Sequence, residues 1–153
     1  MRVMPKDRLM EMAGEDLGTT DWFTIDQDRI DAFADATLDH QFIHVDEDQA
    51  SKTPLGGTIA HGFLTLSLTT YFTAELGVVP ENLLMMFNYG LDRLRFLAPV
   101  RSGSEVRARA RLLSVTEKDP GRLLIKTEIT VEIRGEEKPA MVAETLTLAV
   151  TGG

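Results

Sequence analysis

The spacing of apolar and polar residues predicts a helix in the first quarter of the chain. Apolar residues Ile30, Phe33 and Ala34 occupy the i, i+3 and i+4 positions that share one face of a helix. Asp26 is a residue type that caps helix N-termini, and it stands just before this pattern. We therefore expect a helix that begins at Asp26, ends near Thr37 and turns its apolar face to the core.

The longest apolar tract runs from Ile59 to Leu76, after a loop marked by Pro and Gly at 54–57. Its apolar residues cover too wide an arc for a surface helix, so we expect a central helix surrounded by other elements. Gly77 stands where helices commonly end in a left-handed residue, and Pro80 follows it.

From Leu83 onward the hydrophobic period changes to two. Between 104 and 116, alternate residues are apolar and arginine, and 123–133 and 142–150 alternate in the same way. Gly121 and Gly135 lie in turn sequences between these segments. The pattern predicts a meander of about four antiparallel strands, each wet on one face.

These elements predict an α+β fold in which an antiparallel sheet wraps around a long central helix. We expect one domain over 1–153, with 1–20 as an N-terminal leader that contains about one helical turn. The outer sheet face and the edge strands would be available for pairing with a second copy.

Length and composition are those of a folded globular domain. The 153 residues (17.0 kDa) suit one domain with a real core, at 43% hydrophobic and 26% charged residues. The chain has no cysteine, which excludes disulfides, thiolate metal sites and a cysteine nucleophile. Charged residues interrupt the N-terminus, and no apolar tract approaches a bilayer span, so we expect no export, no membrane segment and a cytoplasmic protein.

The net charge of −8 argues against nucleic acid as a partner. The charge is uneven, because residues 93–111 hold six Arg against Glu105 alone. That cluster favours either an anionic ligand or a solvated arginine-rich strand face, and the pattern alone leaves both open.

The stretch around Asp39 and His44 carries the densest titratable chemistry. A carboxylate and an imidazole form the minimal pair for moving protons near neutral pH. Residues five apart lie about 140° apart around a regular helix, so the two side chains can converge only across a loop or a broken turn. The spacing alone is a weak pattern with many false matches, and it does not exclude a solvated loop between two helices.

Gly62 opens the central apolar tract. Backbone N–H groups in the first turn of a helix have no internal partner, so this turn can hold an anion or the oxyanion of a thioester enolate. A glycine there also suits close packing of a neighbouring strand. We expect His61 to orient the loop or fill space.

Three ordered motifs over about residues 20–150 resemble one known family. DHQFIHVDEDQA at 39–50, TIAHGFLTLSL at 58–68 and NYGLDRLRFLAPV at 88–100 are similar to the MaoC-like hydratases, especially their NodN-like branch. The resemblance implies a hot-dog fold, a homodimer or dimer of dimers, and a lyase of fatty acid metabolism. That enzyme reversibly hydrates trans-2-enoyl thioesters to (R)-3-hydroxyacyl thioesters and needs no metal or organic cofactor.

The resemblance also implies roles for single residues. The catalytic aspartate falls on Asp39, the catalytic histidine on His44 and the oxyanion amide on Gly62. The flanking residues implied to contact substrate are Gln41, Ala60, His61 and Phe63. The family more often has Gly before the aspartate and Asn-Pro within the motif, where this chain has Leu38, Gln41 and Phe42.

The substrate is expected to be an acyl-CoA or acyl carrier thioester, whose anionic carrier would suit the arginine cluster. Two other functions stay open: a hot-dog thioesterase, and a non-catalytic acyl-thioester binding protein. A third hypothesis is a metal site built from His40, His44, Asp46 and Asp48.

Overall fold

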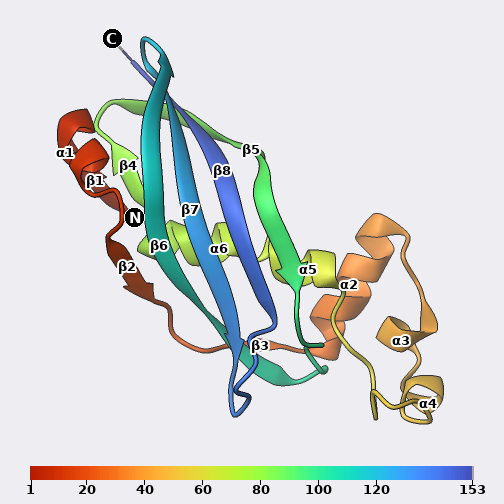
Figure 1. Ribbon diagram of the computed structural model, residues 1–153. Helices are drawn as coiled ribbons and strands as arrows, with labels where there is room; N and C mark the ends of the chain where they lie inside the picture. The colour runs from red at the N-terminus through yellow and green to blue at the C-terminus, as the bar shows by residue number, and fades with distance from the viewer. Residues whose placement is uncertain (153) are drawn as a thin grey trace.

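The computed structural model describes residues 1–152 as a curved sheet with a helix across one face (Figure 1). The sheet has six strands in the order β2-β6-β7-β8-β5, and β3 also pairs with β6. A separate parallel pair joins β1 to β4. The strands are β1 (Arg2–Met4), β2 (Asp16–Thr19), β3 (Phe23–Ile25), β4 (Val78–Pro80), β5 (Leu83–Phe96), β6 (Ser104–Asp119), β7 (Arg122–Ile133) and β8 (Met141–Thr151).

The predicted antiparallel hairpins are confirmed for β6–β7 and β7–β8. Gly121 and Gly135, in the turns between them, have φ of +77° and +83°, values that favour glycine. The predicted four-strand meander is wrong in one respect. Strand β5 pairs with β8 instead of β6. The meander therefore consists of the last three strands, and β5 is the edge strand beside β8.

The central helix begins later than predicted and is divided in two, α5 (Gly62–Ser67) and α6 (Thr69–Leu76). Ile59 and Ala60 are extended because Ile59 bridges to Arg101 and the Ala60 N–H donates to the Val100 carbonyl. At the division, the Thr69 hydroxyl donates to the carbonyl of Leu66, a local bond of the kind that bends helices.

One face of this helix is open within the single chain. Leu64 and Phe72 are buried in the core, whereas Phe63 is 65% and Tyr71 56% exposed, so the prediction of a fully surrounded helix is wrong for one copy. Gly77 is also not left-handed, with φ −64° and ψ 159°. Glycine is needed there because a Cβ would overlap the Thr73 carbonyl oxygen.

The N-terminal segment is part of the fold. The predicted helical turn is α1 (Lys6–Glu11), whose Leu9 is fully buried. Strand β2 extends the main sheet beside β6. Residues 1–20, expected to be a leader, therefore complete one end of the core, where Leu9 packs in a cluster with Leu112 and Leu123.

Three helices form an arm beyond one end of the sheet (Figure 1). They are α2 (Gln27–Thr37), α3 (Phe42–Val45) and α4 (Glu47–Ala50). The helix start predicted at Asp26 is confirmed, since its side chain accepts a hydrogen bond from the Arg29 N–H at 2.9 Å. Among residues 1–152, no helix is both long and apolar enough to cross a bilayer.

Candidate active site

A sharp bend separates α2 from α3, as the spacing of Asp39 and His44 required. Leu38 ends α2 in the left-handed conformation, with φ 62° and ψ 21°, and its side chain is 82% exposed. Asp39 and His40 follow as irregular chain, and α3 begins after Gln41. The Gln41 N–H donates to the Asp39 carboxylate at 3.3 Å, which restrains that side chain. The broken turn thus replaces the 140° separation that a continuous helix would impose.

His44 is buried, with one ring nitrogen committed to the backbone. Its Nδ1 lies 2.7 Å from the Ile59 carbonyl oxygen, which can only accept, so Nδ1 carries the proton and Nε2 keeps a lone pair. Burial lowers the pKa of His44 below its ordinary 6.5, and the neighbouring His61 adds to this effect. The bond to Ile59 and the charge of Asp39 oppose the shift. The net result favours a neutral imidazole, which can accept a proton.

Asp39 faces the two histidines from the exposed side of the bend. Its side chain is 53% exposed, and a carboxylate oxygen of Asp39 and one ring nitrogen each of His44 and His61 all lie within 4.8 Å of one another. A carboxylate and an imidazole whose polar atoms lie this close can both contact one water molecule.

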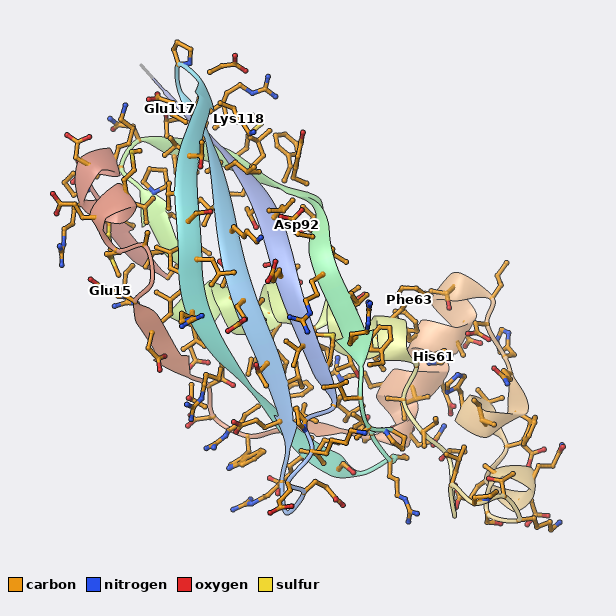
Figure 2. The ribbon with its side chains drawn as sticks, in the orientation of Figure 1. Glu15, His61, Phe63, Asp92, Glu117 and Lys118 are labelled. Atoms are coloured by element: carbon orange, nitrogen blue, oxygen red, sulfur yellow. The ribbon has the colours of Figure 1, made fainter. Side chains whose placement is uncertain are left out.

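His61 links the bend to the start of α5 (Figure 2). Its Nε2 donates to the Asp39 carbonyl at 2.9 Å, and its ring stacks on His44 with centroids 3.8 Å apart and planes 22° apart. The side chain is only 3% exposed, and within residues 1–152 its Nδ1 has no hydrogen-bond partner. An unpaired buried acceptor typically costs about 1–3 kcal/mol.

Gly62, the first residue of α5, serves close packing and leaves its amide free. A Cβ on Gly62 would lie 3.1 Å from three ring atoms of Phe96 in β5, so the packing interpretation holds. Within the described chain, the Gly62 N–H donates to no protein group. A cavity of about 290 Å³ lies beside it, lined by Gly62, Ala60, Thr65 and residues 96–100.

The remaining residues expected to contact substrate occupy different environments. Phe63 lies on the side of β5, against Phe96 with ring centroids 6.0 Å apart (Figure 2). Gln41 is exposed at the start of α3. Ala60 lines the cavity, but its N–H is used by Val100. The His61 side chain is buried against Asp39 and His44, so it contacts the loop, as the orienting interpretation expected.

A hydrogen-bonded network that the sequence did not indicate holds the arm against the start of the central helix. The buried Thr58 hydroxyl donates to Gln27 at 2.7 Å and lies 2.9 Å from the Glu47 carboxylate, which also accepts from the Thr58 N–H. Gln27 in turn donates to the His44 carbonyl at 2.7 Å. These bonds lower the pKa of Glu47 below its ordinary 4.5. The network fixes His44 from its backbone side.

The metal site considered from His40, His44, Asp46 and Asp48 is not assembled in the described chain. His40 pairs with Asp35 at 2.7 Å, and Asp46 caps α4 through the Gln49 N–H. Asp39, His44 and His61 do approach one another, but Nδ1 of His44 and Nε2 of His61 are already bonded to backbone carbonyls.

The arginine cluster is divided between two environments. Arg107, Arg109 and Arg111 lie on one face of β6, within 4 Å of glutamates on β7. These three form the solvated strand face, so the interpretation of the whole cluster as an anion site is wrong for them. Within residues 1–152, Arg93, Arg95 and Arg101 form no ion pair.

Known proteins match the chain over most of its length. Residues 9–136 match the family model described as MaoC like domain. The chain is 47% identical to Nodulation protein N of Rhizobium leguminosarum bv. viciae, over 88% of this chain and 84% of the relative. It is 45% identical to 3-hydroxyacyl-thioester dehydratase Z of Mycobacterium tuberculosis, over 90% of this chain and 91% of that protein.

A solved (R)-hydratase from A. caviae superimposes with a TM-score of 0.72 at 22% identity, over 88% of this chain and 94% of that one. At that identity the likeness establishes the fold. The predicted antiparallel sheet around a central helix is therefore confirmed.

Proposed function

The chain belongs to the MaoC-like domain family, and from that premise we propose that it reversibly hydrates trans-2-enoyl thioesters to (R)-3-hydroxyacyl thioesters. Dehydratase Z, its 45% identical relative, acts by its name on 3-hydroxyacyl thioesters. One observation carries the proposal: the Asp39 carboxylate and the His44 ring converge across a broken turn at the end of α2.

In the proposed reaction, one water molecule lies between Asp39 and the free Nε2 of His44. The dyad takes a proton from the water as its oxygen bonds to C3, and the C2=C3 electrons move toward the thioester oxygen. The Gly62 N–H stabilises the enolate charge that develops there. C2 then takes a proton from the dyad, the carbonyl re-forms, and dehydration is the same path reversed.

The test follows crotonyl-CoA by enoyl absorbance and by free thiol at the same time. Loss of absorbance without thiol supports a hydratase, thiol release indicates a thioesterase, and binding without turnover indicates a non-catalytic binding protein. Asp39→Asn and His44→Gln should each reduce turnover by about 10²–10⁴-fold, the usual size of general acid–base help. His40→Gln is the matched control, because His40 is exposed and pairs with Asp35, and it should retain wild-type turnover.

The pH dependence tests His44 separately. Hydration requires the neutral ring, and the pKa of His44 is lowered, so activity should persist below the ordinary value of 6.5 and fall only at more acidic pH. An acidic limb above 6.5 would contradict this assignment.

The carrier is proposed to be coenzyme A or an acyl carrier protein, held through Arg101. This guanidinium has no acidic partner in the described residues and lies within about 4 Å of the position of a Cβ on Gly56. Arg101 follows Val100, one of the residues that line the cavity beside Gly62. Arg101→Gln should raise KM and leave kcat unchanged, whereas Arg109→Gln, on the ion-paired face, should change neither.

The protein is further proposed to form a homodimer through β5. This strand ends the main sheet, and it exposes apolar side chains that soluble monomers rarely gather on one edge. Leu84, Phe87 and Tyr89 are 65%, 49% and 62% exposed. Phe87→Lys should yield a monomer by sedimentation, and a monomeric wild type would contradict the proposal.

A further inference from the structure

We propose that His61 is a positioning residue for the reaction: it fixes the Asp39 backbone and holds the His44 ring, without touching substrate. The inference rests on the proposed function, because it assigns Asp39 and His44 as the acting pair. Its evidence is the geometry of the three side chains.

His61 holds Asp39 at its backbone. The Nε2–H of His61 donates to the Asp39 carbonyl at 2.9 Å, and this bond spans 22 residues of sequence. Leu38, the preceding residue, is in a conformation that L side chains rarely adopt, so local preference does not hold this bend. The bond therefore ties the bend to the start of α5, the same element that presents the Gly62 amide.

His61 also supports the His44 ring from one side. The two rings lie face to face with centroids 3.8 Å apart, and Phe33 of α2 packs against His61 at 4.9 Å. His44 is thus held between this stack and the Ile59 carbonyl on its Nδ1. His61 therefore contacts both members of the pair, the Asp39 backbone and the His44 ring.

The groups around His44 identify which electrostatic influence His61 supplies. The Asp39 carboxylate and the His61 ring are the titratable groups that act on it, and the Ile59 carbonyl accepts from it. From α2, Gln27 contacts its backbone carbonyl and Phe33 packs on His61, and neither is charged. Asp39 favours protonation of His44, whereas the positive charge of a protonated His61 would oppose it.

The unpaired Nδ1 of His61 makes this role testable. A residue kept for stability alone would be expected to satisfy both ring nitrogens, yet among residues 1–152 this buried atom has no hydrogen-bond partner. Replacement of the ring by an apolar one should therefore separate stability from activity.

Two variants divide the contributions. His61→Phe keeps an aromatic ring but loses the donor, whereas His61→Gln keeps a side-chain N–H able to reach the Asp39 carbonyl but loses the ring. For His61→Phe we expect an unchanged or higher Tm, with kcat on crotonyl-CoA reduced roughly 100-fold at nearly constant KM, as for a misplaced catalytic group. His61→Gln should recover part of that loss.

A second readout does not depend on turnover. The chain has three histidines, so NMR titration can follow His44, assigned by the signal missing in His44→Gln. Loss of the His61 imidazole should raise the pKa of His44 in both variants. If His61→Phe does not fold, the pKa of His44 measured in His61→Gln tests the proposal.

Each outcome bears on the proposal. An unchanged His44 titration with wild-type kcat overturns it, and so does a parallel fall of Tm and kcat in both variants, which marks a merely structural residue. If the wild type does not turn over any enoyl thioester, the proposed function fails. The titration then still decides whether His61 controls His44.

Discussion

Replacing Leu38 tests whether the bend before Asp39 is strained. Leu38 has φ 62° and is 82% exposed. The left-handed conformation costs an L-residue roughly 1–2 kcal/mol, which glycine avoids. Against this gain, a glycine variant loses about 0.4–1 kcal/mol of stability, because glycine gives the unfolded chain more conformational entropy. Full burial of a leucine is worth about 1.5–3 kcal/mol, so the small buried fraction of this side chain contributes roughly 0.5 kcal/mol.

The decisive comparison is Leu38→Gly against Leu38→Ala. Both variants lose the small buried area of the leucine side chain, but alanine keeps the backbone strain. The free energy of unfolding of Leu38→Gly should therefore exceed that of Leu38→Ala by about 0.5–1 kcal/mol. Urea unfolding followed by far-UV circular dichroism measures the difference as a shift in midpoint at constant slope. An alanine variant as stable as the glycine variant, or more stable, would refute a left-handed Leu38.

Two further substitutions test the rest of the site. Gly62→Ala should lower both turnover and stability, because its Cβ would lie 3.1 Å from the Phe96 ring. Gly152→Ala is the control, because its Cβ would make an ordinary 3.7 Å contact. The control should match wild type in the crotonyl-CoA assay and in thermal melts. Thr58→Val should destabilise the protein near neutral pH, and the difference should shrink as the pH falls. The Thr58 backbone N–H and, after it, the Thr58 hydroxyl depress the pKa of Glu47 in the folded state, and valine removes only the hydroxyl. The stabilisation from the hydroxyl contact is present above the ordinary value of 4.5 and is lost as the pH drops through the folded pKa. A difference in unfolding free energy that stays constant with pH would contradict that linkage.

Local patterns predicted the features that depend on neighbours in sequence. The start of α2 at Asp26 and the irregular bend after Thr37 both follow from short-range periodicity and capping. The place of β5 does not, because an alternating pattern is the same whichever strand lies beside it. The bond between Thr58 and Gln27 joins residues 31 apart, and no local signal connects them.

The face of β6 that carries Arg107, Arg109 and Arg111 shows why strand register could not be predicted from the sequence. The β6–β7 hairpin pairs Asp119 with Arg122, and a regular ladder from that pair would put Arg134 opposite Arg107. Irregularities in β6 shift the register, so Glu132 lies there and pairs with Arg107 at 2.7 Å. Bulges of this kind decide whether a charged strand face is neutralised or free.

The bond from His44 Nδ1 to the Ile59 carbonyl leaves this imidazole a single route for hydrogen. A ring open on both sides can pick up hydrogen from a reactant and release it to bulk solvent through the opposite nitrogen. Here the same atom must do both. In dehydration, the acceptor next to that nitrogen is the departing hydroxyl, so deuterium abstracted from C2 of a labelled hydroxyacyl thioester should leave in the released water, and its rate of return to carbon would measure how fast that water departs.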